Sequence, residues 1–520
     1  MTNVLVFMTD QQRGSTIDPA HRVRAITPRI DKFRNTGVTF TRAYAPSPHC
    51  CPSRASFFTG RYPSEHGVWN NVNVSNALSR GPREHVAFWS QDFAEAGYQL
   101  GFSGKWHVSN SQSPEVFGWD ELLLHPPMPA AASSKESEHT TARNAEWAEL
   151  KNSLAPSDAS ERMPGEIIRP GWPRYVQYGV DEAPFRDDAV TDQAVSFIAE
   201  RADGERPWML YVGTLGPHDP YTPPQRFLDM YDPEEITLPA SFIDPLDDKP
   251  ALYRRTRDPF DQLSLEEHRE SLRHYLAFCS YEDYLFGRLL DALESSGELE
   301  NTLVLYVSDH GDYTSEHGLW AKGLPSFDAA YNVPLVIGGA NISTRAAGTT
   351  CDVPVSLVDL GPTLLEECGV TSRTRPSGFS LSAALRGQAL NLPRNELVFQ
   401  SNGNEAYGIQ RIVMTDSWKL VYNMFDDDEL YDRVADPDEM TNLLASTPGR
   451  SLGTAPSARI PAHLRTTVRD LYERLWRFAK QHEDDIINSY IVTALAHFGP
   501  TTTAHTWNVS PPQTPAASEA

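Results

Sequence analysis

The 520-residue chain is poor in cysteine, in positive charge and in long apolar segments, and each shortage excludes a class of protein. Its five cysteines are too few and too scattered for a disulfide framework. The 45 Lys and Arg are outnumbered by 69 Asp and Glu, and the net charge of −24 argues against nucleic acid or an anionic membrane as a partner. No apolar run reaches the ~20 residues of a transmembrane helix, and the run at residues 4–8 is too short for a signal peptide, so we expect a cytoplasmic protein.

The chain is, by contrast, rich in residues that fill a core. Hydrophobic residues make up 40% of it, including 11 Trp, 20 Tyr and 22 Phe. Its length exceeds what one hydrophobic core usually holds. We therefore expect a large domain over residues 1–370, a smaller C-terminal subdomain over 371–499 and a mobile tail over 500–520.

Four short apolar runs end in clusters of polar residues. The runs are residues 4–8, 98–102, 208–212 and 303–307, and the polar residues after them include Asp10, Lys105, His107, His218, Asp309 and His310. Continuous apolar runs of this length, separated by helical patterns, indicate parallel strands covered on both faces of a sheet. Because ligands bind beyond the carboxyl ends of such strands, the polar residues predict a site at one edge. The fold class we expect is α/β, with a large, mostly parallel sheet between layers of helices.

Two other stretches complete the predicted organisation. Residues 126–187 are rich in Pro, Ala, Ser and Glu with weak periodicity, which fits either an insertion over the rim of the site or a disordered surface loop. Short strand-like runs between residues 397 and 422 predict a small antiparallel sheet, and a helix is expected over 461–482. The C-terminal subdomain is therefore expected to be α+β.

Residues 50–61, which read CCPSRASFFTGR, say most about function. Pro52 suits the first turn of a helix, because its φ is preset and it has no N–H to leave unpaired, and Gly60 suits the end of one. Cys50 is therefore expected at the positive end of a short helix, where anions bind, with the charge of Arg54 one turn along. Taken alone, the motif also fits a buried thiol or two adjacent cysteines in a tight turn.

The pattern CxPSR at residues 50–54, followed by TGR at 59–61, resembles the signature of the type I sulfatases in the alkaline phosphatase superfamily. The resemblance extends over roughly residues 3–444, with the family's motifs in the expected order. It implies that Cys50, and not Cys51, is oxidised to formylglycine by a maturation enzyme, and that the hydrated aldehyde is the nucleophile.

The resemblance also implies a divalent cation. Asp10, Asp309 and His310 match the family's metal ligands, together with the modified Cys50. Gln11 stands where many sulfatases have a second Asp, and His310 where many have Asn. Oxygen ligands favour Ca²⁺, whereas an imidazole and one carboxylate fewer make Mn²⁺ the alternative. Of the two, we expect Ca²⁺.

Further motif matches imply residues that act on the substrate. They are the Lys-x-His pair Lys105 and His107, the later His218 and Lys322, and Asn71, which matches an Asn that contacts sulfuryl oxygens in some branches. Displacement at sulfur spreads negative charge over its oxygens, and Arg54, Lys105 and Lys322 would stabilise that charge together with the metal. His218 or Lys322 is expected to protonate the leaving oxygen, and His107 to act as the base in the step that expels sulfate.

The function we expect is hydrolysis of a small sulfate monoester, on a sulfated carbohydrate. Within the superfamily the alternatives are an arylsulfatase of broad range and a phosphonate or phosphate ester hydrolase, although Lys105 and His107 favour sulfate. Outside it, the alternatives are a protein that binds sulfated ligands without catalysis and a redox protein that uses the thiols of Cys50 and Cys51. No heptad pattern or apolar stripe decides the oligomeric state, so a homo-oligomer stays open.

Overall fold

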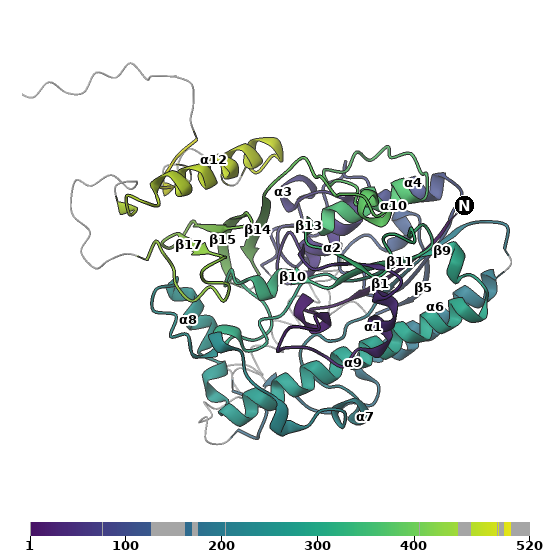
Figure 1. The fold of residues 1–520 in the computed structure, drawn as a ribbon, viewed down its shortest axis with the longest axis horizontal. Coiled ribbons are helices and arrows are strands. Elements are labelled where there is room, and N and C mark those ends of the chain that lie inside the picture. Colours follow the sequence, from purple (N-terminus) through teal and green to yellow (C-terminus); the bar gives the residue numbers. More distant parts are fainter. Residues whose placement is uncertain are drawn as a thin grey trace, which may run out of the picture.

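A computed structural model describes residues 2–74, 76–125, 162–168, 175–202, 204–404, 406–445, 459–485, 487, 493 and 495–500. Most of the predicted rim insertion, at 126–161 and 169–174, lies outside the described residues, as does the predicted tail beyond residue 500. Within the described part, a large sheet lies between two layers of helices, and a smaller sheet carries a long helix of its own (Figure 1). None of the helices described is long and apolar enough to cross a membrane.

The central sheet, as far as the structure describes it, has eight strands in the order β12-β2-β11-β9-β1-β8-β4-β5. These strands are β1 (Asn3–Thr9), β2 (Val38–Phe40), β4 (Gln99–Gly104), β5 (Asp120–Leu124), β8 (Trp208–Gly213), β9 (Thr302–Ser308), β11 (Leu335–Gly339) and β12 (Thr349–Cys351). The five strands from β9 to β5 run parallel, while β11 pairs antiparallel with both β9 and β2. The four predicted strands are β1, β4, β8 and β9, which are neighbours in the sheet, and the predicted α/β class is confirmed.

In the described part of the chain, the other elements are three small sheets and the helices. The small sheets contain β10 (Asn332–Val333), β3 (Ala43–Tyr44) and β13 (Val355–Ser356); β14 (Leu397–Gly403), β15 (Tyr407–Met414), β16 (Trp418–Asn423) and β17 (Glu429–Asp432); and β6 (Glu166–Ile167) with β7 (Tyr175–Val176). The α-helices are α1 (Pro28–Arg34), α2 (Cys50–Thr59), α3 (Pro63–His66), α4 (Trp89–Glu95), α6 (Asp187–Arg201), α7 (Gln225–Leu228), α8 (Ala251–Arg257), α9 (Leu265–Ser295), α10 (Leu360–Glu367), α11 (Ser382–Leu385) and α12 (Arg465–Gln481).

Side chains of β1 alternate between two apolar layers, which explains why its sequence is an unbroken apolar run. Val4, Val6 and Met8 belong to the layer that contains α2, α4 and α10. Leu5 and Phe7 belong to the opposite layer, which contains α1, α6 and α9. Figure 1 shows these two sets of helices on opposite sides of the sheet.

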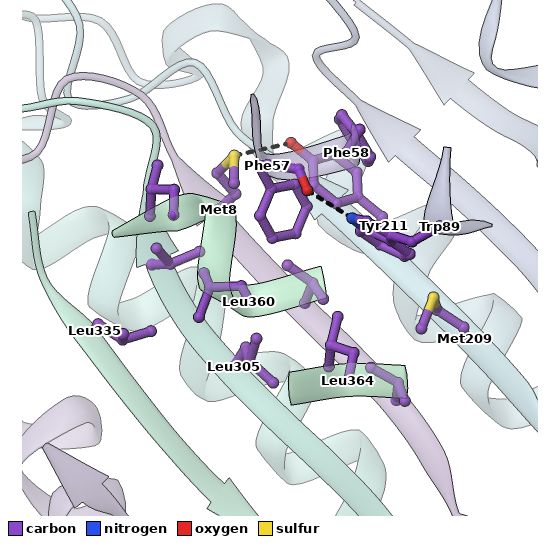
Figure 2. Close-up of a cluster of buried hydrophobic side chains, with 14 of the residues drawn as sticks. Met8, Phe57, Phe58, Trp89, Met209, Tyr211, Leu305, Leu335, Leu360 and Leu364 are labelled. Atoms are coloured by element: carbon purple, nitrogen blue, oxygen red, sulfur yellow. Dashed lines mark hydrogen bonds between the residues drawn. The ribbon is translucent and has the colours of Figure 1, made fainter. Parts of the chain in front are cut away.

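Aromatic side chains fix α2 against the sheet, as Figure 2 shows. The ring of Phe57 packs edge-on against that of Trp89, with centroids 5.4 Å apart at 89°, a favourable arrangement for aromatic pairs. The indole N–H of Trp89 donates to the carbonyl of Phe57, and the hydroxyl of Tyr211 donates to the sulfur of Met8 at 3.2 Å. This packing holds the first residue of α2, Cys50, at a fixed place beside the ends of the strands.

The strands β14–β17 form the small antiparallel sheet that the sequence predicted. Leu420 on this sheet belongs to the same apolar cluster as Leu471 and Leu475 of α12, which starts a few residues later than expected. Phe399 and Ile412 belong to another cluster that includes side chains of the larger part of the chain. The small sheet is therefore packed between α12 and the rest of the molecule.

Candidate active site

Cys50 is the first residue of α2 and is almost completely buried. The helix begins there, two residues before Pro52, because His49 precedes it in an extended conformation (φ −120°, ψ 146°). It ends where the sequence predicted, since Gly60 has a left-handed φ of 64°, which glycine adopts without steric cost.

Four buried side chains meet beside this helix end: Asp10, Cys50, Asp309 and His310. Their ligand atoms all lie within 4.8 Å of one another. The Cys50 sulfur is 3.2 Å from His310 Nε2 and 3.8 Å from a carboxylate oxygen of Asp10. Asp10 follows β1 and Asp309 follows β9, and because these strands are parallel neighbours, residues about 300 positions apart come together.

This group fits a divalent cation. Nε2 of His310 lies 3.7 Å from carboxylate oxygens of both Asp10 and Asp309. Nδ1 of the same ring lies 2.9 Å from the carbonyl of Gly311, which assigns the hydrogen to Nδ1 and leaves the lone pair of Nε2 free to bind a metal. Carboxylates suit Ca²⁺ and Mn²⁺, and the imidazole is a ligand typical of transition metals.

Gln11, the remaining predicted ligand, directs its side chain to other partners. Its Nε2 donates to Asp219 at 3.1 Å and to Asp312 at 2.6 Å, and its Oε1 accepts from the ammonium of Lys322. Its backbone N–H donates to Asp309 at 3.1 Å, so the residue still contacts the group. A role for Gln11 as a ligand stays a prediction.

Arg54 and Lys105 supply the positive charge that two buried carboxylates require. Nε of Arg54 donates to Asp309 at 2.7 Å and Nη2 donates to Asp10 at 3.2 Å, while the ammonium of Lys105 also contacts Asp10. Burial raises the pKa of Asp10, but Lys105 and the other positive neighbours outweigh burial and hold this pKa well below its usual range. Arg54 is fully buried, and its Nη1 also donates to the carbonyl of Lys105 at 3.0 Å and to the hydroxyl of Tyr211 at 2.8 Å.

The surroundings of Cys50 stabilise negative charge on its side chain. Burial disfavours the thiolate, yet the charges of Lys105 and Lys322 lower the pKa of the thiol well below its ordinary value. The same field would favour any anionic oxygen at this position. Cys51, although adjacent, has the opposite shift, because burial and then Cys50 raise its pKa.

Lys322 and His218 lie side by side in the site. Nζ of Lys322 is 2.6 Å from Nε2 of His218, so the chain after β9 returns Lys322 to the site as the sequence predicted. Asp219, which the sequence did not single out, contacts His218, with its Oδ1 3.3 Å from His218 Nδ1. Its Oδ2 accepts a hydrogen bond from the Tyr175 hydroxyl. Burial raises the pKa of Asp219, but His218 and Lys322 bring it down to about 2.

His107 and Asn71 belong to two different loops, and Asn71 contacts the start of α2. Nε2 of His107 lies 2.9 Å from Oδ1 of Asn73, and burial together with the charge of Lys105 lowers the pKa of the imidazole. Asn71 accepts a hydrogen bond from the backbone N–H of Cys51 at 3.0 Å, which places it at the start of α2. Asn73 had no signal in the sequence beyond its closeness to Asn71.

The structure therefore brings predicted residues that lie far apart in the sequence to one edge of the large sheet. The family model for sulfatases matches residues 2–370 of the chain. The chain belongs to the sulfatase family. Members of this family are sulfuric ester hydrolases. A second model, for the C-terminal region of N-sulphoglucosamine sulphohydrolase, matches residues 315–460 of the sulfatase and so overlaps the first match.

Individual relatives span most of this sulfatase. The choline-sulfatase of Rhizobium meliloti is 30% identical over 468 residues, which cover 86% of this chain and 83% of the relative. The human N-acetylglucosamine-6-sulfatase is 26% identical over 491 residues, covering 87% and 82%. The crystal structure of the phosphonate monoester hydrolase of Agrobacterium radiobacter superposes with a TM-score of 0.71 over 93% of this chain and 96% of that one. At 20% identity this last likeness shows the fold alone.

Proposed function

We propose that this sulfatase hydrolyses the sulfate monoester of a small carbohydrate, using formylglycine made from Cys50 and one divalent cation. The observation that supports this most directly is the position of Cys50, inside the group of Asp10, Asp309 and His310 and in a field that favours an anion. Formylglycine would supply, as its hydrate, a hydroxyl nucleophile at residue 50. A formylglycine-generating maturation enzyme is thus an expected partner.

The residues that would hold the cation are Asp10, Asp309, His310 and residue 50, with Gln11 as the further predicted ligand. A bound cation polarises a sulfate oxygen and lowers the pKa of a hydroxyl that it binds. Ca²⁺ is the first choice and Mn²⁺ the alternative, because the donors combine carboxylates with one imidazole.

The remaining polar residues have roles that their contacts support. Lys105 and Lys322 place positive charge where the sulfuryl oxygens gain negative charge. Nζ of Lys322 lies 2.6 Å from Nε2 of His218, so either group could give a proton to the leaving oxygen. Asn71, which accepts from the N–H of Cys51, would contact the sulfuryl group, and Arg54 would hold the two carboxylates in position.

A carbohydrate substrate is supported by two comparisons. One relative is named an N-acetylglucosamine-6-sulfatase, and the C-terminal match is to a model of N-sulphoglucosamine sulphohydrolase. An arylsulfatase of broad range, or a hydrolase of phosphonate or phosphate esters, is the alternative. The domain boundaries near residues 370 and 499, the cytoplasmic location and a homo-oligomer stay predictions.

The test is a substrate panel, assayed with protein produced together with a maturation enzyme. The panel contains sulfated mono- and disaccharides, an aryl sulfate, choline sulfate, a phosphonate monoester and a phosphate diester, compared by kcat/KM. We expect a sulfated sugar to give the highest value. A phosphorus ester that is turned over far faster than any sulfate would contradict the proposal, and a preferred aryl sulfate would contradict its carbohydrate part. Mass spectrometry of the residue-50 peptide shows independently whether the thiol has become an aldehyde.

A further inference from the structure

His107 lies in a setting that distinguishes its two ring nitrogens. Nε2 is 2.9 Å from the side-chain oxygen of Asn73. Nδ1 is buried and makes no hydrogen bond of good geometry with any residue that the structure describes. Burial and the charge of Lys105 lower the pKa of the imidazole, and Cys50 partly opposes them.

An amide oxygen can only accept a hydrogen bond, so its partner nitrogen must carry the hydrogen. With Asn73 Oδ1 at Nε2, the neutral imidazole of His107 has its hydrogen on Nε2 and a lone pair on Nδ1. In a histidine that acts as a base, the nitrogen with the lone pair receives the proton. The contact with Asn73 therefore decides which ring nitrogen of His107 can act as the base.

Hydrogen bonds hold the backbone on both sides of Asn73. Nη1 of Arg80 donates to the carbonyls of Val72 and Val74, at 2.8 and 2.9 Å. Nδ2 of Asn110 donates to the same Val72 carbonyl at 2.6 Å. Since Asn110 lies three residues after His107, this bond joins the loop that carries Asn73 to the loop that carries the imidazole.

Two further features restrict the imidazole and its partner. His107 has a left-handed backbone with φ 50°, which few non-glycine residues adopt unless their surroundings hold them there. The turn between β14 and β15 reaches the loop of Asn73, because Asn404 accepts from the N–H of Asn71 at 3.1 Å and from Nδ2 of Asn76 at 3.1 Å. Both sides of the hydrogen bond are thus fixed by contacts outside it.

We propose that Asn73 is a positioning residue, which holds the hydrogen of His107 on Nε2 and so leaves Nδ1 as the ring nitrogen that can take a proton in the step that expels sulfate. The proton transfer rests on the proposed function, since an unmodified thiol has no second hydroxyl to deprotonate. The tautomer itself does not, because it follows from Asn73 and His107 alone.

The experiment compares wild type with Asn73→Leu, which has a similar volume and no acceptor, and Asn73→Asp, which keeps an oxygen acceptor. Asn76→Ala is the matched control, because Asn76 lies on the same loop and its Nδ2 donates to the carbonyl of Asn404. Nitrogen NMR of protein labelled with ¹⁵N-histidine reports the tautomer, recorded at alkaline pH so that the ring is neutral. The signal of His107 is assigned by its loss in His107→Gln.

We expect the hydrogen on Nε2 in wild type, Asn73→Asp and Asn76→Ala, and a mixed or reversed tautomer in Asn73→Leu. In kinetics on a sulfate ester, Asn73→Leu should lower kcat by about tenfold to a hundredfold. Its kcat/KM should stay within about threefold, because the base acts only after the ester bond is broken. A merely structural defect would lower kcat/KM as well.

A hydrogen on Nδ1 in wild type would overturn the proposal, and so would an unchanged tautomer in Asn73→Leu. If Asn73→Leu does not fold, wild type and Asn73→Asp still decide the tautomer. If no sulfate ester is hydrolysed by any of these proteins, the proposed function fails, while the NMR result remains an independent answer about Asn73.

Discussion

Nε of Arg54 donates to Asp309 across 2.7 Å, and neither side chain is exposed to solvent. The same guanidinium reaches Asp10 on the neighbouring strand, so one cation lies between two carboxylates that would otherwise repel each other in a buried site. The fork of donors on arginine suits this bridging, whereas the single ammonium of lysine does not. The site therefore depends on Arg54 before any ligand binds.

Arg54→Lys is expected to lower the free energy of unfolding by about 3 to 5 kcal/mol, because at least one buried carboxylate loses its partner. Turnover of a sulfate ester should fall by at least about a hundredfold, since Asp10 and Asp309 are no longer held in place. Denaturant unfolding and kcat/KM measure the two effects.

The matched control is Arg411→Lys, because Arg411 forms an equally buried pair with Asp484 in the C-terminal part of the chain. It should lose comparable stability and retain much more activity. Equal losses of activity in the two variants would contradict a specific role for Arg54.

Gly104, at the end of β4, sets the direction of the chain into Lys105. Its φ is 102°, and a Cβ there would lie 1.9 Å from the carbonyl oxygen of Gly213, which also accepts the N–H of Lys105. Gly104→Ala is expected to cost about 3 kcal/mol or more, from strain and from the close contact. Gly97→Ala is the control: its φ is 90° but no atom lies near the added carbon, so about 1 to 2 kcal/mol is expected. Similar thermal unfolding of both variants would contradict this account.

Glu282 on α9 makes stability depend on pH. It is fully buried, and neither carboxyl oxygen makes a hydrogen bond of good geometry to a described residue. Burial, and then the charge of Asp187, raises its pKa well above the ordinary 4.5. The folded protein therefore keeps a proton that the unfolded chain releases above that value, so this group reduces stability as pH rises from about 4.5 toward the folded pKa.

Glu282→Gln removes the ionisable group, so it should be increasingly more stable than wild type as pH rises above about 4.5. The denaturant midpoint measured between acidic and mildly alkaline pH tests this. Glu266→Gln, an exposed residue near the start of the same helix, should instead follow the wild-type curve. Parallel curves for Glu282→Gln and wild type would count against the raised pKa.

Binding of a cation should appear as a thermal shift in chelator-treated protein. A ligand that binds only the folded state stabilises it by about 2.7 kcal/mol at a hundred times its Kd, so Ca²⁺ or Mn²⁺ should raise the Tm. Asp309→Asn removes a donor and should abolish the shift. Asp244→Asn, which changes a buried acid paired with His317 instead, should keep it. No response in wild type to either ion would contradict the metal site.

The strands and the residues at their carboxyl ends could be predicted because each rests on a local pattern. Asp10, Asp309 and His310 follow apolar runs, and those runs are adjacent strands in the structure. The direction of Gln11 could not be predicted, because it depends on a left-handed backbone with φ 66° that nothing about a glutamine indicates.

Residues that act by contacting a predicted site residue could not be predicted from the sequence either. Asp219 follows directly after the predicted His218, yet its contact with Tyr175 depends on a segment far away in the chain. Asn73 meets His107 because two loops are joined through Asn110. Such contacts require the three-dimensional arrangement, since no spacing in the sequence records them.

The most direct test measures inorganic sulfate released from a sulfate ester by three proteins, all produced with the maturation enzyme: wild type, Cys50→Ala and Cys51→Ala. Both cysteines are buried at the start of α2, so the two variants lose similar packing and differ in which thiol is missing. We predict that wild type and Cys51→Ala release sulfate and that Cys50→Ala releases none above background. Sulfate release by Cys50→Ala at the wild-type rate would contradict the account.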